Sequence, residues 1–352
     1  MTKCGDETRN AALLSSGSEK FTAKMFTETA IKNQGKSFVI SAFSVLTPLA
    51  QLSLASEGNT HDELVQALGS PDDQTTKSIF QHMNSKLKSV KGVELKMASK
   101  IYIADDYSIN DEYAAVSRET FQSDIGNVDF RKSIQTAGKI NAWVENQTNH
   151  RIKDLVDPNS LSADTKAVLV NTIYFKGCWK FPFQRNLTRN RDFHVPQEKT
   201  IKVPTMYTKG SYLYSENEEL DAQLLEIPYD GDESAFIIIL PNKVDGVTEL
   251  VNKLKHPSAL TNALQSMSHF EVEAYIPKFK IETTTNLKEI LPKVGVKEIF
   301  DSSRANLTKL IRNQKDLYIS EATQKAFIEI NEEGAEAAAG NSKNIFNTLQ
   351  FS

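Results

Sequence analysis

The stretch AVLVNTIYF at 167–175 places the strongest limit on how this chain can fold. Apart from Asn171 and Thr172, its residues are apolar or aromatic, so a strand there carries such side chains on both faces. A strand of this kind is typical of the interior of a sheet that is covered on both sides. The sequence therefore predicts a large sheet with AVLVNTIYF inside it.

Further strand patterns fill the second half of the chain, and helical patterns come mainly before them. Strands are expected at 37–40, 94–104, 166–177, 212–229, 234–241, 269–285 and 316–333. Helices are expected at 19–33, 44–56, 60–69, 73–90 and 135–150. Because the two kinds of element show no βαβ rhythm, we predict the α+β class with large, mostly antiparallel or mixed sheets.

The segment NTHDELVQALG at 59–69 shows the clearest helix end signals. Thr60 and Glu63 have the spacing of a capping box, in which each side chain binds the other residue's backbone N–H. Leu64 and Leu68 share one face, and Gly69 predicts the end of the helix.

Size and composition favour one soluble globular domain. The 352 residues contain no repeat, low-complexity block or linker, so we expect a flexible extension at 1–18 and a single domain at 19–352. The net charge of −4 gives no reason to expect a nucleic-acid partner. The longest apolar run, AFIIIL at 235–240, is too short to span a bilayer, so no membrane segment is expected.

Motifs of catalysis and metal binding are missing from the sequence. The six histidines include no His-Glu-x-x-His pair, and there is no Gly-x-Ser-x-Gly, Gly-rich phosphate loop or Cys-x-x-Cys. Cys4 and Cys178 are too few for a disulfide scaffold. We therefore expect a protein that is not an enzyme and needs no cofactor or metal.

Two surface patterns each have two interpretations. The lysines near one expected helix suit either a bound polyanion, such as a glycosaminoglycan, or a solvated helix face. They are Lys77, Lys86, Lys88, Lys91, Lys96 and Lys100. Three asparagines match the N-x-[ST] pattern, either as glycosylation sites or by chance. They are Asn146, Asn186 and Asn306.

Several segments, taken in order, resemble one protein family. They are FVISAFSVLTPLAQLSLASEGNTHDELVQALG (38–69), INAWVENQTNHRIKDLV (140–156), AVLVNTIYFKGCWKFPF (167–183), AYIPKFKIETTTNLKEILPKVGVKEIF (274–300) and LYISEATQKAFIEINEEGAEAAA (317–339). These blocks resemble the serpins and cover almost the whole chain. The resemblance implies three β-sheets, about eight or nine helices, and a central sheet that can accept the reactive-centre loop as an extra strand.

The resemblance also explains the end of the chain. The resemblance implies a suicide inhibitor, whose own loop is cleaved and which then holds the protease in a covalent complex. NEEGAEAAA resembles the hinge of the family's reactive-centre loop, here 334–352. The hinge residues are Glu332, Glu333, Gly334, Ala335, Glu336, Ala337, Ala338 and Ala339. Side chains alternate along a strand, so Ala335, Ala337 and Ala339 would enter the core as methyl groups. Lys343 would follow on the same face, where a buried ammonium is costly.

The family's sheet-opening region also has counterparts here. They are Ser41, Ser44, Asn171, Gln324 and Trp179. Gln324 stands where the family usually has a histidine. An amide donates and accepts, so a hydrogen-bonded cluster can form, but it does not titrate near neutral pH.

By the family's usual loop length, the cleaved bond lies between Thr348 and Leu349, with any position in 345–352 open. No Arg or Lys lies between 344 and 352, so we expect a serine or cysteine protease that is not trypsin-like. The alternative is a non-inhibitory serpin with a binding, storage or chaperone role, which Lys343 keeps open.

The serpin pattern continues for some thirty or forty residues beyond this loop. We therefore expect a cleaved serpin whose C-terminal strands form a separate chain, bound to this one in an otherwise monomeric protein. The compartment stays open: extracellular if a signal peptide preceded Met1, and otherwise cytoplasmic.

Overall fold

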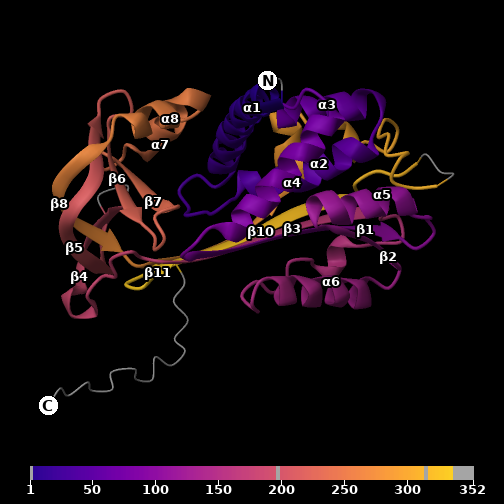
Figure 1. Ribbon diagram of the computed structural model, residues 1–352. Coiled ribbons are helices and arrows are strands. Elements are labelled where there is room, and N and C mark those ends of the chain that lie inside the picture. The colour runs from indigo at the N-terminus through magenta and orange to yellow at the C-terminus, as the bar shows by residue number, and fades with distance from the viewer. Residues whose placement is uncertain (1–2, 196–198, 313–315, 336–352) are drawn as a thin grey trace, which may run out of the picture.

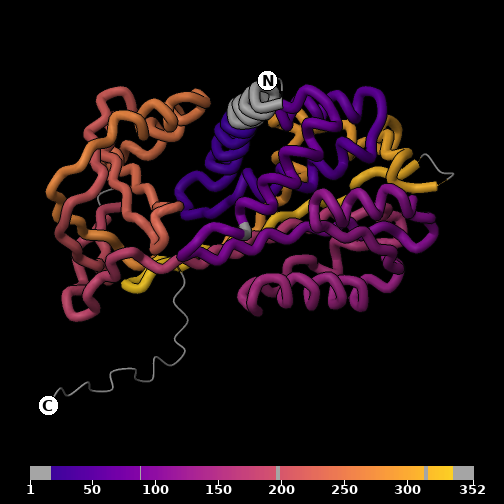
Figure 2. The backbone as a smooth tube through the Cα atoms, viewed as in Figure 1, coloured from indigo at the N-terminus to yellow at the C-terminus, as the bar shows by residue number. Residues whose placement is uncertain are grey.

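The computed structural model describes residues 3–195, 199–312 and 316–335, without the side chains of residues 3–16 and of Lys88 (Figures 1 and 2). In Figure 1 a long sheet crosses the molecule, with most helices above its right-hand part and a second group of strands at the left. Among these residues no helix has the length and apolar character needed to cross a membrane.

The larger sheet has six strands in the order β2-β1-β3-β11-β10-β9. They are β1 (Val93–Ala104), β2 (Asp124–Val128), β3 (Ala167–Cys178), β9 (Phe279–Asn286), β10 (Glu321–Asn331) and β11 (Gly334–Ala335). β3 lies inside the sheet, and residues 167–172 are buried, which confirms the prediction from the apolar stretch. The expected antiparallel or mixed character is also confirmed, because β1 pairs with β2 in parallel and with β3 in antiparallel.

Helices cover both faces of this sheet, and Figure 1 shows α2 and α4 on one face and α6 on the other. The helices are α1 (Lys3–Lys32), α2 (Ala42–Ala55), α3 (Gly58–Leu68), α4 (Asp73–Ser89), α5 (Asp111–Val116), α6 (Ser133–Gln147), α7 (Val247–Lys253), α8 (Pro257–Gln265) and α9 (Leu287–Ile290). These nine helices of the described residues agree with the expected number. α2 is buried on all sides and lies at the centre of the main core.

Short helical turns complete the helical elements. They are η1 (Ser117–Phe121), η2 (Pro158–Ser160), η3 (Arg185–Leu187), η4 (Leu291–Val294) and η5 (Glu298–Phe300).

The second sheet has the order β4-β5-β6-β7, with β8 also paired to β5. Its strands are β4 (Arg189–Val195), β5 (Lys199–Asn217), β6 (Ala222–Pro228), β7 (Ala235–Pro241) and β8 (Ser268–Pro277). The described residues thus form two hydrogen-bonded sheets where we expected three. The reason is the 19-residue β5, which pairs with β4, β8 and β6 in turn and joins strands that would otherwise be separate.

Three local predictions differ from the structure. Residues 37–40 form no strand, although the Val39 N–H binds the Thr283 hydroxyl at 2.9 Å. The first helix begins at Lys3 and so includes most of the expected extension. The capping box at Thr60 and Glu63 is wrong: the Thr60 hydroxyl binds the Glu298 carboxylate at 3.2 Å, and Glu63 accepts from the backbone of Lys297 and Glu298. Both side chains bind a segment that is distant in the sequence, which local spacing could not reveal.

Candidate functional site

The seam between β3 and β10 is the feature on which the candidate site depends. Along most of their length these two strands pair directly and in parallel, from Val168 with Glu321 to Tyr174 with Phe327. At one end, β11 lies between them, with Ala335 opposite Gly177 on β3 and Ile330 on β10. The first two residues of the expected loop therefore already occupy a strand position in the sheet.

Backbone packing explains why glycine stands at the start of β11. Gly334 has a φ of 147°, in the region that other residues rarely adopt. A Cβ atom at this position would lie 1.9 Å from the Gly177 carbonyl oxygen. Ala335 follows it and is fully buried in a second core cluster together with Trp179, Tyr229 and Ile330.

Two glutamates hold the turn between β10 and β11. The Glu332 carboxylate is nearly buried and accepts hydrogen bonds from Lys278 at 2.7 Å and from the Thr188 hydroxyl at 2.8 Å. The carboxylate of Glu333, which is more exposed, forms an ion pair with Arg185. The sequence did not identify Lys278, Thr188 or Arg185, because nothing in their local patterns links them to the hinge.

Trp179 binds the same turn from the end of β3. Its indole N–H donates to the Asn331 carbonyl oxygen at 2.8 Å, and its backbone N–H donates to the Glu333 carbonyl at 3.0 Å. The ring stacks on Tyr229 with 4.8 Å between centroids. The expected place of Trp179 beside the entry of the hinge agrees with this geometry.

The anchor at Glu332 leads to a prediction about pH. Burial opposes ionisation of Glu332, but hydrogen bonds from Lys278, from its own backbone and from Thr188 outweigh it and hold the pKa below 4.5. A depressed folded-state pKa adds stability above the unfolded-state value, and this stability is lost as the pH falls through the folded-state value. We expect Glu332→Gln to lower the free energy of unfolding by about 1.5–3 kcal/mol at neutral pH.

Thermal unfolding of both proteins from neutral pH down to about pH 3 would check this, since the range brackets a carboxyl pKa. The gap between the two midpoints should narrow as the pH falls. A gap of constant size would contradict the ionic role of Glu332.

A second group of residues, here called the seam cluster, consists of Ser41, Ser44, Asn171 and Gln324. Asn171 on β3 and Gln324 on β10 are opposite each other in the strand register. The Gln324 amide nitrogen lies 2.8 Å from Asn171 Oδ1, from Ser44 Oγ and from the Ser41 carbonyl oxygen. Asn171 in turn donates to the Ser44 carbonyl at 2.9 Å, and its Oδ1 accepts from the Ser44 hydroxyl at 2.8 Å.

The seam cluster joins both strands of the seam to the start of α2. Ser44, Asn171 and Gln324 are buried, so water does not replace these hydrogen bonds while the sheet stays closed. Separation of β3 from β10 must break the bond between Gln324 and Asn171. The four polar residues expected to lie together therefore do so, at the boundary that an inserted strand would have to open.

On the other face of the seam, the segment between α6 and β3, residues 148–166, contacts β10. Lys325 on β10 is largely buried, and its ammonium group donates to the Lys153 carbonyl at 2.5 Å and pairs with Glu282 at 2.6 Å. Asn141 of α6 exchanges two hydrogen bonds with the backbone of Val156. Through these hydrogen bonds the segment connects α6 to β10.

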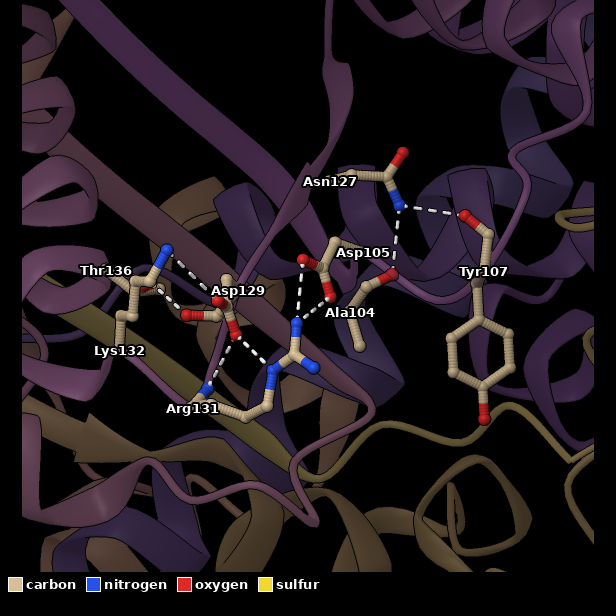
Figure 3. Close-up of polar contacts among 8 residues, drawn as sticks. All are labelled: Ala104, Asp105, Tyr107, Asn127, Asp129, Arg131, Lys132 and Thr136. Carbon is tan, nitrogen blue, oxygen red and sulfur yellow. Dashed lines mark hydrogen bonds and ion pairs between the residues drawn. The ribbon is translucent and has the colours of Figure 1, made fainter.

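The start of α6 is fixed to the end of β1 and β2 by a polar network (Figure 3). The Arg131 guanidinium lies between Asp105 at 3.2 Å and Asp129 at 2.6 Å. The Asp129 carbonyl accepts from the Thr136 hydroxyl in the first turn of α6. Hydrogen bonds from Arg131 hold the pKa of Asp129 below its ordinary value. α6 is thereby held in place over the sheet.

Several expected site residues fall elsewhere. Glu336, Ala337, Ala338, Ala339, Lys343, Thr348 and Leu349 lie outside the described residues. Of the asparagines in glycosylation patterns, Asn146 and Asn186 are exposed, whereas Asn306 Oδ1 accepts a hydrogen bond from Thr308 at 2.8 Å. In the part of the chain that the structure describes, no group of three or more His, Cys, Asp and Glu side chains could hold a metal ion.

A family model, curated relatives and solved structures all match this chain to the same protein family. Residues 16–351 match the family model described as Serpin (serine protease inhibitor). Two Bombyx mori proteins, Antichymotrypsin-2 and Antitrypsin, are each 54% identical to this chain over 334 residues, which cover 95% of it and 88% and 85% of theirs. The crystal structure of Serpin48, a highly specific serpin of the insect Tenebrio molitor, superposes on this one with a TM-score of 0.87. The two sequences are 34% identical, and the match covers 94% of this chain and 90% of the Serpin48 chain.

Proposed function

The chain belongs to the serpin family, and from this premise we propose that it inhibits a protease by a suicide mechanism in which the cleaved loop enters the larger sheet. In the proposed reaction the nucleophile of the protease attacks the carbonyl of the scissile peptide bond, the C–N bond breaks, and the C-terminal side leaves as a free amine. The acyl-enzyme, an ester or a thioester, is then carried along with the inserting loop before water can hydrolyse it. The inhibitor's contribution is mechanical and requires no catalytic residue of its own.

The placement of β11 is the observation that carries the proposal. Gly334 and Ala335 already pair with both β3 and β10, so further insertion only has to extend an existing strand along the seam. Each net backbone hydrogen bond contributes about 1 kcal/mol, and ordering a residue costs about 1–2 kcal/mol. Because these quantities nearly cancel, side chains that fit the seam decide whether insertion proceeds. The methyl groups of Ala335, Ala337 and Ala339 satisfy that condition.

We propose a target that is not trypsin-like, cleaved between Thr348 and Leu349. A trypsin-like pocket pairs a buried carboxylate with a basic side chain, and 344–352 contain neither Arg nor Lys. Similarity between whole chains does not decide this point, because one relative is named for chymotrypsin and the other for trypsin. The bond itself follows from the family's loop length.

A panel of purified proteases would test the proposal. Incubation with trypsin, chymotrypsin, elastase and a papain-like enzyme should give, for at least one enzyme other than trypsin, a complex that survives boiling in detergent. Mass spectrometry of the released peptide would identify the cleaved bond. If every enzyme cleaved the loop without forming such a complex, the non-inhibitory alternative would replace the proposal.

A further inference from the structure

The outer edge of β1 is only partly covered, and the insertion proposed above takes place elsewhere in the sheet, between β3 and β10. β2 covers this edge only from Lys100 to Ala104, so β1 from Val93 to Ser99 has no neighbouring strand there among the described residues. On its inner side the same stretch is paired with β3.

The orientation of the β1 backbone shows which groups are free. The Ala98 carbonyl faces β3, where it accepts from the Thr172 hydroxyl at 3.4 Å, and the Ser99 carbonyl faces outward, where it accepts from Ser123 at 2.8 Å. Because this direction alternates along an antiparallel strand, the N–H and C=O of Leu95 and Met97 also face outward. Within the described ranges, no group binds these outward-facing atoms.

Two usual protections of a free strand edge, proline and a bulge, are missing from residues 93–99, which do carry the charged residues Glu94 and Lys96. Natural edges are blocked by proline, by a bulge or by a charged side chain that lies over the backbone. Residues 93–99 contain no proline, and their register with β3 is unbroken. The charged group of Lys96 is turned toward Glu94 at 3.0 Å and Asn149 at 2.7 Å.

A cavity of about 370 Å³ opens beside this edge, between α4 and α6. Toward α4 its lining includes two apolar side chains, Leu87 and Phe121, beside the polar residues Thr47, Asn84 and Gln122. Toward α6 it is lined by Asn146 and Gln147, whose side chains have no partner within the part of the chain that is described. Figure 1 shows the two helices on opposite faces of the sheet, so an added strand would have one face against each.

One lysine lines the cavity, and two others are close to its lining residues in the sequence. Lys96 lines it, Lys86 directly precedes Leu87 on α4, and Lys91 lies in the turn before β1. Lys86 and Lys91 are exposed and have no ion-pair partner among the described residues. These lysines belong to the basic group that the sequence analysis singled out.

We propose that the edge of β1 at Leu95–Met97 binds an extended peptide in which apolar and acidic residues alternate. The peptide adds a strand to the sheet through the free backbone groups, a recognised mode of peptide binding. Successive side chains of that strand point to opposite faces, so apolar residues meet Leu87 and Phe121, and acidic residues face Lys96. Ser44 and Asn171 of the seam cluster also line the cavity, so a bound peptide would lie next to the seam. The proposal does not rest on the proposed function.

The test uses a short fluorescent peptide that alternates valine and glutamate, with blocked termini. Fluorescence anisotropy should show saturable binding to the full chain. A valine–lysine peptide of the same length should bind at least about tenfold more weakly, because like charges meet at the lysines. Hydrogen exchange should show slower exchange at the amides of Leu95 and Met97 when the first peptide is bound.

A matched pair of variants isolates the backbone contribution. Met97→Ala removes the side chain and keeps the N–H, whereas Met97→Pro also removes the outward N–H without affecting the bonds to β3. We expect the proline variant to bind the valine–glutamate peptide about tenfold more weakly than the alanine variant. N-methylation of the peptide at the set of alternate residues whose N–H groups face β1 should weaken binding to the unaltered protein. This second test keeps the proposal falsifiable if the proline variant does not fold.

Three results would overturn the proposal. They are the absence of saturable binding, equal binding by the two variants when both are folded, and binding that stays unchanged both when one set of alternate residues is N-methylated and when the other set is. A sulfated polysaccharide that binds both variants equally, while the peptide does not bind, would assign the lysines to a polyanion instead.

Discussion

Ala335→Arg is expected to convert this protein from an inhibitor of its target protease into a substrate. Ala335 is fully buried between β3 and β10, in a cluster with Trp179 and Tyr229. A guanidinium placed there would be buried without an anionic partner, which costs several kcal/mol. Because about 1.4 kcal/mol corresponds to a factor of ten, we expect at least about ten times more inhibitor to be consumed per protease inactivated.

The measurement titrates a fixed amount of protease with the variant and follows both residual activity and the detergent-stable complex. Ile134→Arg provides the control, because it adds the same residue at a position on α6 whose side chain is 77% exposed. The control should inhibit like the unaltered protein. Full inhibition by Ala335→Arg would contradict strand insertion. It would still show that the protease is a target of this protein.

Gln324→Glu is expected to cause the largest loss of stability. The substitution keeps the shape of the side chain but replaces the amide nitrogen, which lies near Ser41, Ser44 and Asn171, by a carboxylate oxygen. Position 324 is fully buried, and an unpaired charge at such a site costs about 3–5 kcal/mol at neutral pH. Urea unfolding at about pH 7 would measure this loss.

The pH dependence distinguishes the charge from a general packing defect. Burial favours the neutral acid, so the folded-state pKa of the new carboxyl would lie above the unfolded value of about 4.3. The loss of unfolding free energy is therefore absent when the pH is below the unfolded-state pKa. It grows as the pH rises toward the folded-state pKa. Gln81→Glu, which makes the same change at an exposed position within α4, should be nearly neutral at both ends of this range. A loss that did not change with pH would contradict the role of the amide in the seam cluster.

Resemblance to a family located residues that no local pattern could have located. Spacing alone gave no reason to place Ser41 and Ser44 beside Asn171 and Gln324, since these residues belong to α2, β3 and β10. The structure brings them together because β3 and β10 are neighbouring strands and β3 packs on α2. Neither local patterns nor the family resemblance identified Lys278 and Thr188. Nothing in their sequence neighbourhoods sets them apart, and only their hydrogen bonds to Glu332 give them a role.

Where local reasoning failed, tertiary contacts had replaced local ones. Thr60 and Glu63 have the spacing of a capping box, yet each side chain binds residues near 298, because a buried long-range partner was available. Residues 37–40 are apolar but form no strand, since the Val39 N–H binds a side chain of β9 and not a neighbouring strand. The described residues form two sheets and not the expected three, because the long strand β5 pairs in turn with β4, β8 and β6 and joins them into one sheet.

The sequence by itself determined the class of the fold, the interior place of β3 and the helices that cover it, because burial fixes the period of apolar residues along a chain. The tertiary structure alone decided that Gly334 and Ala335 lie between β3 and β10, and which groups hold the turn before them. It also decided that, among the described residues, β1 from Val93 to Ser99 has no neighbouring strand on its outer edge. Those properties depend on distances between segments far apart in the chain, and no local pattern of side chains encodes such distances.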